Sequence, residues 1–325
     1  MGLILNFVRR WTLLVAICFG AVVYLIFGFS PRLAAAADVL GPVFDAIFPF
    51  FVFLTLFLTF AKVDFHKMRP QWWHLVLLLA QFAFVAVLCG FVVVVGGSCR
   101  GVKLVAEVLL TCVIAPCAAA APVVTSKLGG DLNGMTTFTL VSSVVASVSI
   151  PAVFPLLESG TGATFLAAFG AILSKLAVVL LLPLALGWLV RHCVSRLYAF
   201  IVRYPDLAFY SWSLSLTITS GITVKNMVHS QSSAAFILVI ALASLAACLA
   251  QLAVGRSLGR RLGREVCCGQ GMFQKNTALA IWVAYVYLTP EASIGAGCYI
   301  LWQNIVNAIE IRQYDGRKAI LPESK

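Results

Sequence analysis

Charged residues are scarce in this chain. Only 11% of its 325 residues are Asp, Glu, Lys or Arg, while 62% are hydrophobic. A typical soluble domain contains about a quarter charged residues, so this composition argues against a soluble enzyme and predicts an integral membrane protein. No polar stretch is long enough to form a separate soluble domain. We therefore expect residues 1–325 to form a single transmembrane unit.

The residues that catalysis or metal binding requires are also few. The four histidines lie at segment ends, no Ser, His and Asp set or phosphate-binding glycine loop is visible, and the ten cysteines lack metal-type spacing. We expect no enzyme activity and no resident cofactor, and we interpret the cysteines as small apolar residues. The net charge of +11 does not indicate nucleic-acid binding, because the basic residues lie between apolar runs, where they orient the chain in the membrane.

Ten apolar runs, each long enough for a membrane crossing of about 20 residues, follow one another along the chain. They cover residues 11–28, 39–61, 74–97, 103–123, 135–157, 163–190, 206–228, 234–254, 266–288 and 292–311. The sequence thus predicts an all-α polytopic membrane protein with ten transmembrane helices, followed by a polar, disordered tail at 312–325.

The basic residues predict how these helices are oriented. If both termini are cytoplasmic, 17 of the 23 Lys and Arg residues fall in cytoplasmic tails and loops, four fall outside, and Lys175 and Lys275 lie within segments. This bias predicts a multi-pass protein of the cell membrane, the inner membrane if the source is bacterial. One alternative stays open: Arg9 and Arg10, the apolar run after them and the small residues 33–37 also fit a cleaved signal peptide.

Two segments in corresponding positions are interrupted by helix breakers and polar residues. Pro116 and Pro122 interrupt the fourth, and the stretch CCGQGMFQKNTALA (267–280) interrupts the ninth. Ten helices divide into five plus five, and secondary transporters are often inverted repeats whose broken helices meet at the binding site. We expect a 5+5 inverted repeat in which helices 4 and 9 are discontinuous and cross.

Polar side chains within the runs mark the expected site. A Lys at the centre of a transmembrane helix costs about 2.5 to 3.5 kcal/mol, so Lys275 is expected to face a cavity or a partner. Gln303 and Asn307 lie on one face of the last segment, either lining a cavity or joining helices. The hydroxyls of the fifth segment are expected to bond to their own helix backbone.

With these residues in place, the chain resembles the bile acid:sodium symporter family, within the bile/arsenite/riboflavin transporter superfamily. The resemblance covers nearly the whole chain. It is sharpest in QKNTALA at 274–280, LWQNI at 301–305 and KLGGDLNGMTTFTLVSS at 127–143. Members are sodium-coupled carriers with a panel and a core domain. The resemblance implies panel helices at about 11–61 and 163–228, and core helices at about 74–157 and 234–311.

The resemblance also assigns site residues. It implies that the ion-binding residues are Gln81, Thr139, Gln270 and Gln274, and that the substrate-binding residues are Thr125, Lys275, Asn276, Gln303 and Asn304.

Two departures from the family pattern concern charge. The family's sodium-site glutamate on helix nine falls at Gln270, and Lys275 is an additional residue between Gln274 and Asn276. Together these changes shift the local formal charge by two units. We expect the Lys275 ammonium to replace a bound cation or to pair with an anionic substrate, and coupling to involve protons, at most one Na⁺, or no ion.

The function expected is secondary active transport of an organic anion, bile-acid-like or a small carboxylate, by alternating access. A lysine, amides and helix N-termini all favour negative charge. A non-transporting sensor and a passive channel on the same fold are the alternatives. The expected partners are the organic anion and the lipid bilayer, with no nucleic acid, and the protein is a monomer or a homodimer.

Overall fold

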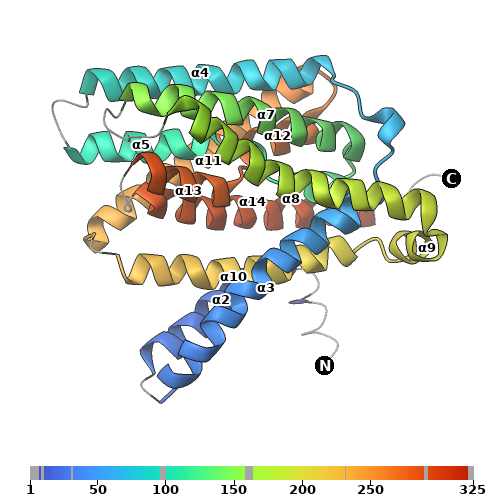
Figure 1. The fold of residues 1–325 in the computed structure, drawn as a ribbon, viewed down its shortest axis with the longest axis horizontal. Helices are drawn as coiled ribbons and strands as arrows, with labels where there is room; N and C mark the ends of the chain where they lie inside the picture. The colour runs from blue at the N-terminus through green and yellow to red at the C-terminus, as the bar shows by residue number, and fades with distance from the viewer. Residues whose placement is uncertain are drawn as a thin grey trace.

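The structure is a computed structural model that describes residues 7–8, 11–30, 32–95, 100–157, 164–230, 232–288 and 292–320. These residues form an all-helical bundle of long rods (Figure 1). The helices are α2 (Thr12–Phe29), α3 (Ala34–Phe60), η1 (Phe65–Lys67), α4 (Trp72–Val95), α5 (Arg100–Ile114), α6 (Ala121–Lys127), α7 (Leu132–Leu157), α8 (Phe165–Cys193), α9 (Ser195–Arg203), α10 (Leu207–Val228), α11 (Ala234–Arg261), α12 (Glu265–Phe273), α13 (Thr277–Tyr287) and α14 (Ala292–Ile320).

Each predicted segment coincides with a helix or a pair of helices. Eight segments are single helices, whereas the fourth is divided into α5 and α6 and the ninth into α12 and α13. Six described helices are long and apolar enough to cross a membrane: α2, most of α3, α4, α7, α8 and α11. These features are consistent with a polytopic membrane protein. The number of crossings and the 5+5 inverted repeat stay predictions.

The prediction of a disordered tail is wrong for residues 312–320. Helix α14 continues to Ile320, past the predicted end at 311, because the helical spacing of Ile311 and Tyr314 places both against an apolar cluster. Residues 321–325 lie outside the described part. Helix α11 also extends beyond its predicted end, and the short helices η1 and α9 were not predicted.

The helices pack as two sets. Helix α10 packs against α2 and α3, and α3 packs against α8; these are the helices predicted to form the panel. In the other set, α11 packs along α12 and α14, α13 packs on α14, and α4 packs on α5. Figure 1 shows α2, α3 and α10 on one side of the bundle and α4, α5 and α7 on the other. The division into panel and core stays a prediction.

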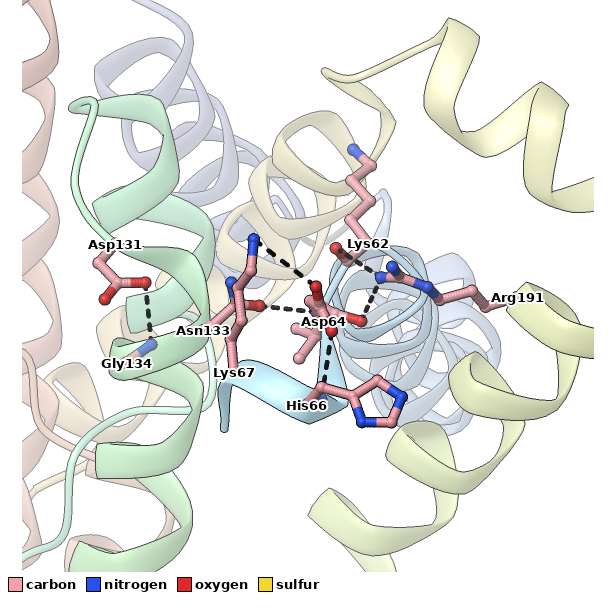
Figure 2. Close-up of polar contacts among 9 residues, drawn as sticks. Lys62, Asp64, His66, Lys67, Asp131, Asn133, Gly134 and Arg191 are labelled. Carbon is pink, nitrogen blue, oxygen red and sulfur yellow. Dashed lines mark hydrogen bonds and ion pairs between the residues drawn. The ribbon is translucent and has the colours of Figure 1, made fainter. Parts of the chain in front are cut away.

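One end of the bundle is held by hydrogen bonds to the segment between α3 and α4 (Figure 2). Arg191 at the end of α8 donates to the Val63 carbonyl oxygen at 2.6 Å, and Asn133 at the start of α7 accepts from the Asp64 backbone N–H at 2.7 Å. Asp64 also caps η1, since its carboxylate accepts from the His66 N–H at 3.1 Å. The segment that joins the two sets is thus bonded to both.

Helices α2 and α10 approach so closely that their backbones touch at Gly20. A Cβ atom added at Gly20 would collide with the Thr217 carbonyl of α10, and Gly221 on α10 faces the Gly20 carbonyl in turn. Close approach through small residues drives much of the helix association in membranes, where no hydrophobic force joins apolar helices. Gly20 therefore sets the distance between these two helices.

We expect Gly20→Val to destabilise the protein by about 1–3 kcal/mol, because the added methyl groups force α2 and α10 apart. Thermal unfolding of the detergent-purified chain measures the loss. Gly90→Ala is the matched control, since a Cβ at Gly90 meets no atom within 4 Å. An equal melting temperature for the two variants would contradict this account of the contact.

Candidate functional site

The two helix breaks cross each other and are joined through their backbones. The Ala118 N–H donates to the Gln274 carbonyl oxygen, and the Asn276 N–H donates to the Pro116 carbonyl oxygen, each at 2.8 Å. These bonds form an isolated antiparallel bridge between Cys117 and Lys275. Backbone polar groups freed by a break in a membrane helix need new partners, and here each break supplies them to the other.

Gln303 on α14 fixes the ninth-segment break from its other side. Its amide oxygen accepts from the Lys275 backbone N–H at 2.9 Å, and its amide nitrogen donates to the Lys275 carbonyl oxygen at 3.3 Å. One side chain therefore satisfies both backbone groups of the residue at the break. The Gln303 side chain is itself buried, so these bonds are protected from competing water.

Lys275 is fully buried, with 0% of its surface exposed. Its ammonium nitrogen has no hydrogen-bond partner among the described residues. Cys117 lies opposite it in the bridge, and Phe273, two residues earlier, is equally buried. A buried, unpaired ammonium is costly, which favours a functional reason for its presence.

A cavity of about 120 Å³ lies at the crossing. Its wall includes Gln274, Lys275, Asn276, Gln303 and Asn304, so the structure brings together four of the five predicted substrate-binding residues and one predicted ion-binding residue. The first residues of α13 also line it, and Asn276 caps that helix by accepting from the Leu279 N–H at 3.1 Å. A helix N-terminus at a cavity wall favours a negatively charged ligand.

The fifth predicted substrate residue, Thr125, does not line this cavity. It lies in α6, completely buried, and its hydroxyl oxygen has no partner among the described residues. Gln274 and Gln270 likewise each have a buried amide oxygen without a partner there, as does Asn304. Carbonyl and hydroxyl oxygens of this kind can coordinate a hard cation.

Gln81 and Thr139, both predicted to bind ions, lie on the other side of the fourth-segment break. The Gln81 amide donates to the carbonyl oxygens of Ile114 and Ala115 at 3.1 and 3.2 Å, where α5 ends. The Thr139 hydroxyl donates to the Met135 carbonyl oxygen at 3.0 Å, as expected for hydroxyls of the fifth segment. Both residues support the break, and their ion-binding role stays a prediction.

Gln270 lies in a network that contains the carboxylate absent from its own position. Its amide nitrogen donates to Glu310 at 2.8 Å and to Asn307 at 3.1 Å, and the Glu310 carboxylate also pairs with Arg256 at 2.5 Å. The sequence indicated a loss of negative charge at this place. The structure corrects this in part: α14 brings a carboxylate beside Gln270, and Arg256 pairs with both this carboxylate and that of Glu265.

Sequence reasoning missed the side of the cavity formed by α3 and α10. Thr55 on α3 and Ser215 and Thr219 on α10 line it together with Trp212. The alternation of hydroxyls with apolar residues from Ser211 to Thr223 was the available signal, since α10 is the most hydroxyl-rich helix outside the fifth segment. The cavity is therefore bounded by helices of both packing sets.

The two sets are in contact at the end of the bundle where α6 ends. Lys127 at the end of α6 pairs with Asp206 before α10 at 2.6 Å. Within the set that contains α3 and α10, Lys62 donates to the Pro205 carbonyl oxygen at 2.7 Å. Burial lowers the pKa of Lys62 from its usual value, with the Asp206 carboxylate opposing this shift. An apolar cluster with Leu13, Leu128 and Ile311 lies beside these contacts. These contacts join the two sets at this end of the bundle.

A comparison with protein families gives a match. The family model described as the Sodium Bile acid symporter family matches residues 49–255, which is more than half of the chain. The matched span begins within α3 and ends within α11, so it contains the first break and KLGGDLNGMTTFTLVSS, while the second break and LWQNI lie beyond it. A search of curated proteins finds no match. The family match confirms the resemblance inferred from the motifs.

We expect Gln303→Met, which conserves shape but removes both hydrogen bonds, to destabilise the protein by about 1–3 kcal/mol, because it leaves the buried Lys275 N–H unpaired, while the Lys275 carbonyl keeps the bond from the Thr277 N–H at 2.9 Å. Thermal unfolding of the purified chain measures the effect. Gln313→Met is the matched control, an exposed Gln on the same helix that should leave stability unchanged. Equal stability of both variants would show that Gln303 does not hold the break.

Proposed function

Because the chain belongs to the Sodium Bile acid symporter family, whose members are transporters, we propose that it is a secondary active carrier of an organic anion working by alternating access. The observation that carries this proposal is the cavity at the crossing of the two helix breaks, bounded by both sets of helices. The carrier acts in the cell membrane with both termini in the cytoplasm, as a monomer or a homodimer.

The chemistry of the cavity supports an anionic substrate. Its wall combines the amides of Asn276 and Asn304 with the N-terminal turn of α13, and Lys275 adds a positive charge at the break. No Asp or Glu lines the cavity among the described residues. The aromatic and aliphatic wall from α3 and α10, including Phe48 and Trp212, suits the apolar part of an amphipathic anion.

Lys275 supplies the positive charge that a coupling cation otherwise brings. The ammonium is sealed from solvent and has no partner in the described part of the chain, where the amide oxygens of Gln270 and Gln274 near the break also lack donors. A tethered cation at the break stabilises an anion in the cavity without an ion from solution. The ammonium does not contact the substrate directly in this arrangement, since its nitrogen is buried.

The buried ammonium reduces the number of Na⁺ ions that can couple to transport. Unpaired oxygens of Thr125, Gln270 and Gln274 suit a hard cation, so one Na⁺ remains compatible with the residues present. The Glu310 carboxylate, however, is engaged by Arg256, and the buried ammonium opposes a second positive charge. We therefore expect transport driven by at most one Na⁺, by protons or by the substrate gradient alone.

Alternating access is supported by a weak contact between the two sets at the end of the bundle where α6 ends. The ion pair of Lys127 and Asp206 joins an α6 residue to the start of α10, that is, one packing set to the other. This pair is partly exposed, and such pairs contribute only about 0–1 kcal/mol. A contact of that strength can break in each transport cycle.

Two other functions remain as outcomes of the test. A sensor on this fold binds the anion without moving it, and a passive channel moves it without coupling to any second gradient. Polar residues of the cavity cluster at one depth rather than lining several helices from end to end, which favours a carrier over a pore.

We expect Lys275→Gln to lower uptake about tenfold in sodium-free buffer and to make uptake depend on added Na⁺, because a solution cation then has to replace the lost charge. The measurement is uptake into proteoliposomes of a bile acid, pyruvate, pantoate and a sulfonate, under imposed sodium or proton gradients or none. Lys175→Gln is the matched control, since Lys175 is a segment lysine that does not line the cavity.

Each outcome of this experiment decides something. Unchanged uptake and unchanged ion dependence in Lys275→Gln would discard the tethered cation. Binding of an anion without uptake by the wild type would indicate the sensor, and uptake that never exceeds the imposed substrate gradient under either ion gradient would indicate the channel or uncoupled carriage.

A further inference from the structure

A second and larger cavity, of about 430 Å³, lies away from the helix breaks and is open to the surroundings of the bundle. It is a crevice between α2, α3 and α10, and none of the residues at the crossing lines it. Its volume lies within the roughly 300–1,000 Å³ range of small-molecule sites. The transport function proposed above does not use it.

The walls of the crevice are apolar and face the bilayer. Phe19 of α2 is 61% exposed and Phe44 of α3 is 43% exposed, although both belong to helices apolar enough to span a membrane. Val23 and Ile222 extend the same lining inward. Surfaces of this composition are in contact with acyl chains rather than with water.

The floor of the crevice results from the tight contact of α2 with α10 at Gly20. On α3, an added Cβ at Gly41 would meet no atom within 4 Å, so the space beside this residue is open. Gly20, Gly41 and Gly221 all line the crevice. The absence of a side chain at Gly41 thus widens the crevice on the α3 side.

One end of the crevice carries positive and hydrogen-bonding groups. Lys225 and His229, at the C-terminal end of α10, line it, and the Tyr24 ring lies 6.4 Å from the imidazole. Among the side chains that the structure describes, none forms an ion pair with Lys225. This end lies opposite the Lys127–Asp206 pair, since α10 has 22 residues and spans roughly 33 Å.

From this arrangement we propose that the crevice binds an anionic phospholipid, with an acyl chain between α2, α3 and α10 and the phosphate at Lys225 and His229. Basic pockets between transmembrane helices recognise anionic headgroups, and an apolar channel leading away from the basic end provides the place for a chain. The charge complementarity selects the headgroup, and the exposure of Phe19 and Phe44 places the occupant within the membrane. The bound lipid fills the gap that α3 leaves beside α10.

The test is native mass spectrometry of the full-length purified protein with phosphatidylglycerol or phosphatidylcholine of identical chains. We expect the wild type to retain phosphatidylglycerol preferentially, and Lys225→Gln/His229→Gln to lower that preference roughly tenfold while leaving phosphatidylcholine retention unchanged. Gly41→Leu, which fills the crevice without a clash, should reduce retention of both lipids. Lys67→Gln is the control, a 71% exposed lysine at the opposite end of the bundle.

Three results would overturn the proposal. One is a wild type without preference for phosphatidylglycerol, and another is a preference that both crevice variants retain. The third is displacement of the lipid by the organic anion that the protein transports, since the crevice would then belong to the transport route. Uptake by the Gly41→Leu variant separates this test from that of the proposed function, because the carrier proposal requires no lipid in the crevice.

Discussion

The crossing of two interrupted helices is the constraint on which the rest of the structure depends. A break within a membrane helix exposes backbone groups that hydrocarbon cannot satisfy, and each unsatisfied group costs several kcal/mol. The breaks at Pro116 and Lys275 solve this by bonding to each other and to Gln303. Neither half of the chain can adopt its broken helix without the other half. The same backbone bonds therefore stabilise the fold and form the site.

The sequence was sufficient to predict the helices because hydrophobic length is a strong signal in membrane proteins. Each of the ten segments coincides with a helix or a pair of helices, and both interruptions fall where a segment is divided, since Pro116 cannot donate in a helix and the stretch around Lys275 is too polar to continue one. The end of α14 was placed wrongly because most residues after Ile311 are polar, which lowers the mean hydropathy there, although Tyr314 still packs against the apolar cluster.

The residues of the site could be predicted only where polar side chains stand out within a single apolar segment. Lys275, Asn276, Gln303 and Asn304 were found because they are polar residues in apolar runs, whereas Ser215 on α10 is unremarkable until the fold places it across the cavity. The pairing of Glu310 with Gln270 was equally hidden, since the two residues are 40 positions apart. Such contacts depend on how helices cross, which periodicity does not specify.

The bond from Arg191 to the Val63 carbonyl has a consequence for motion. Gly187 has no side chain, which lets α8 touch the backbone at Phe60 and Ala61. This contact and the Arg191 bond together hold the ends of α3 and α8 against each other, so the two helices move as one rigid unit. This pair of helices cannot rotate against the remaining helices unless the connecting segment from Lys62 to Gln71 changes its conformation. Movement of one set of helices against the other is therefore limited by these roughly ten residues. They lie at the end of the bundle, far from the cavity that the movement would open.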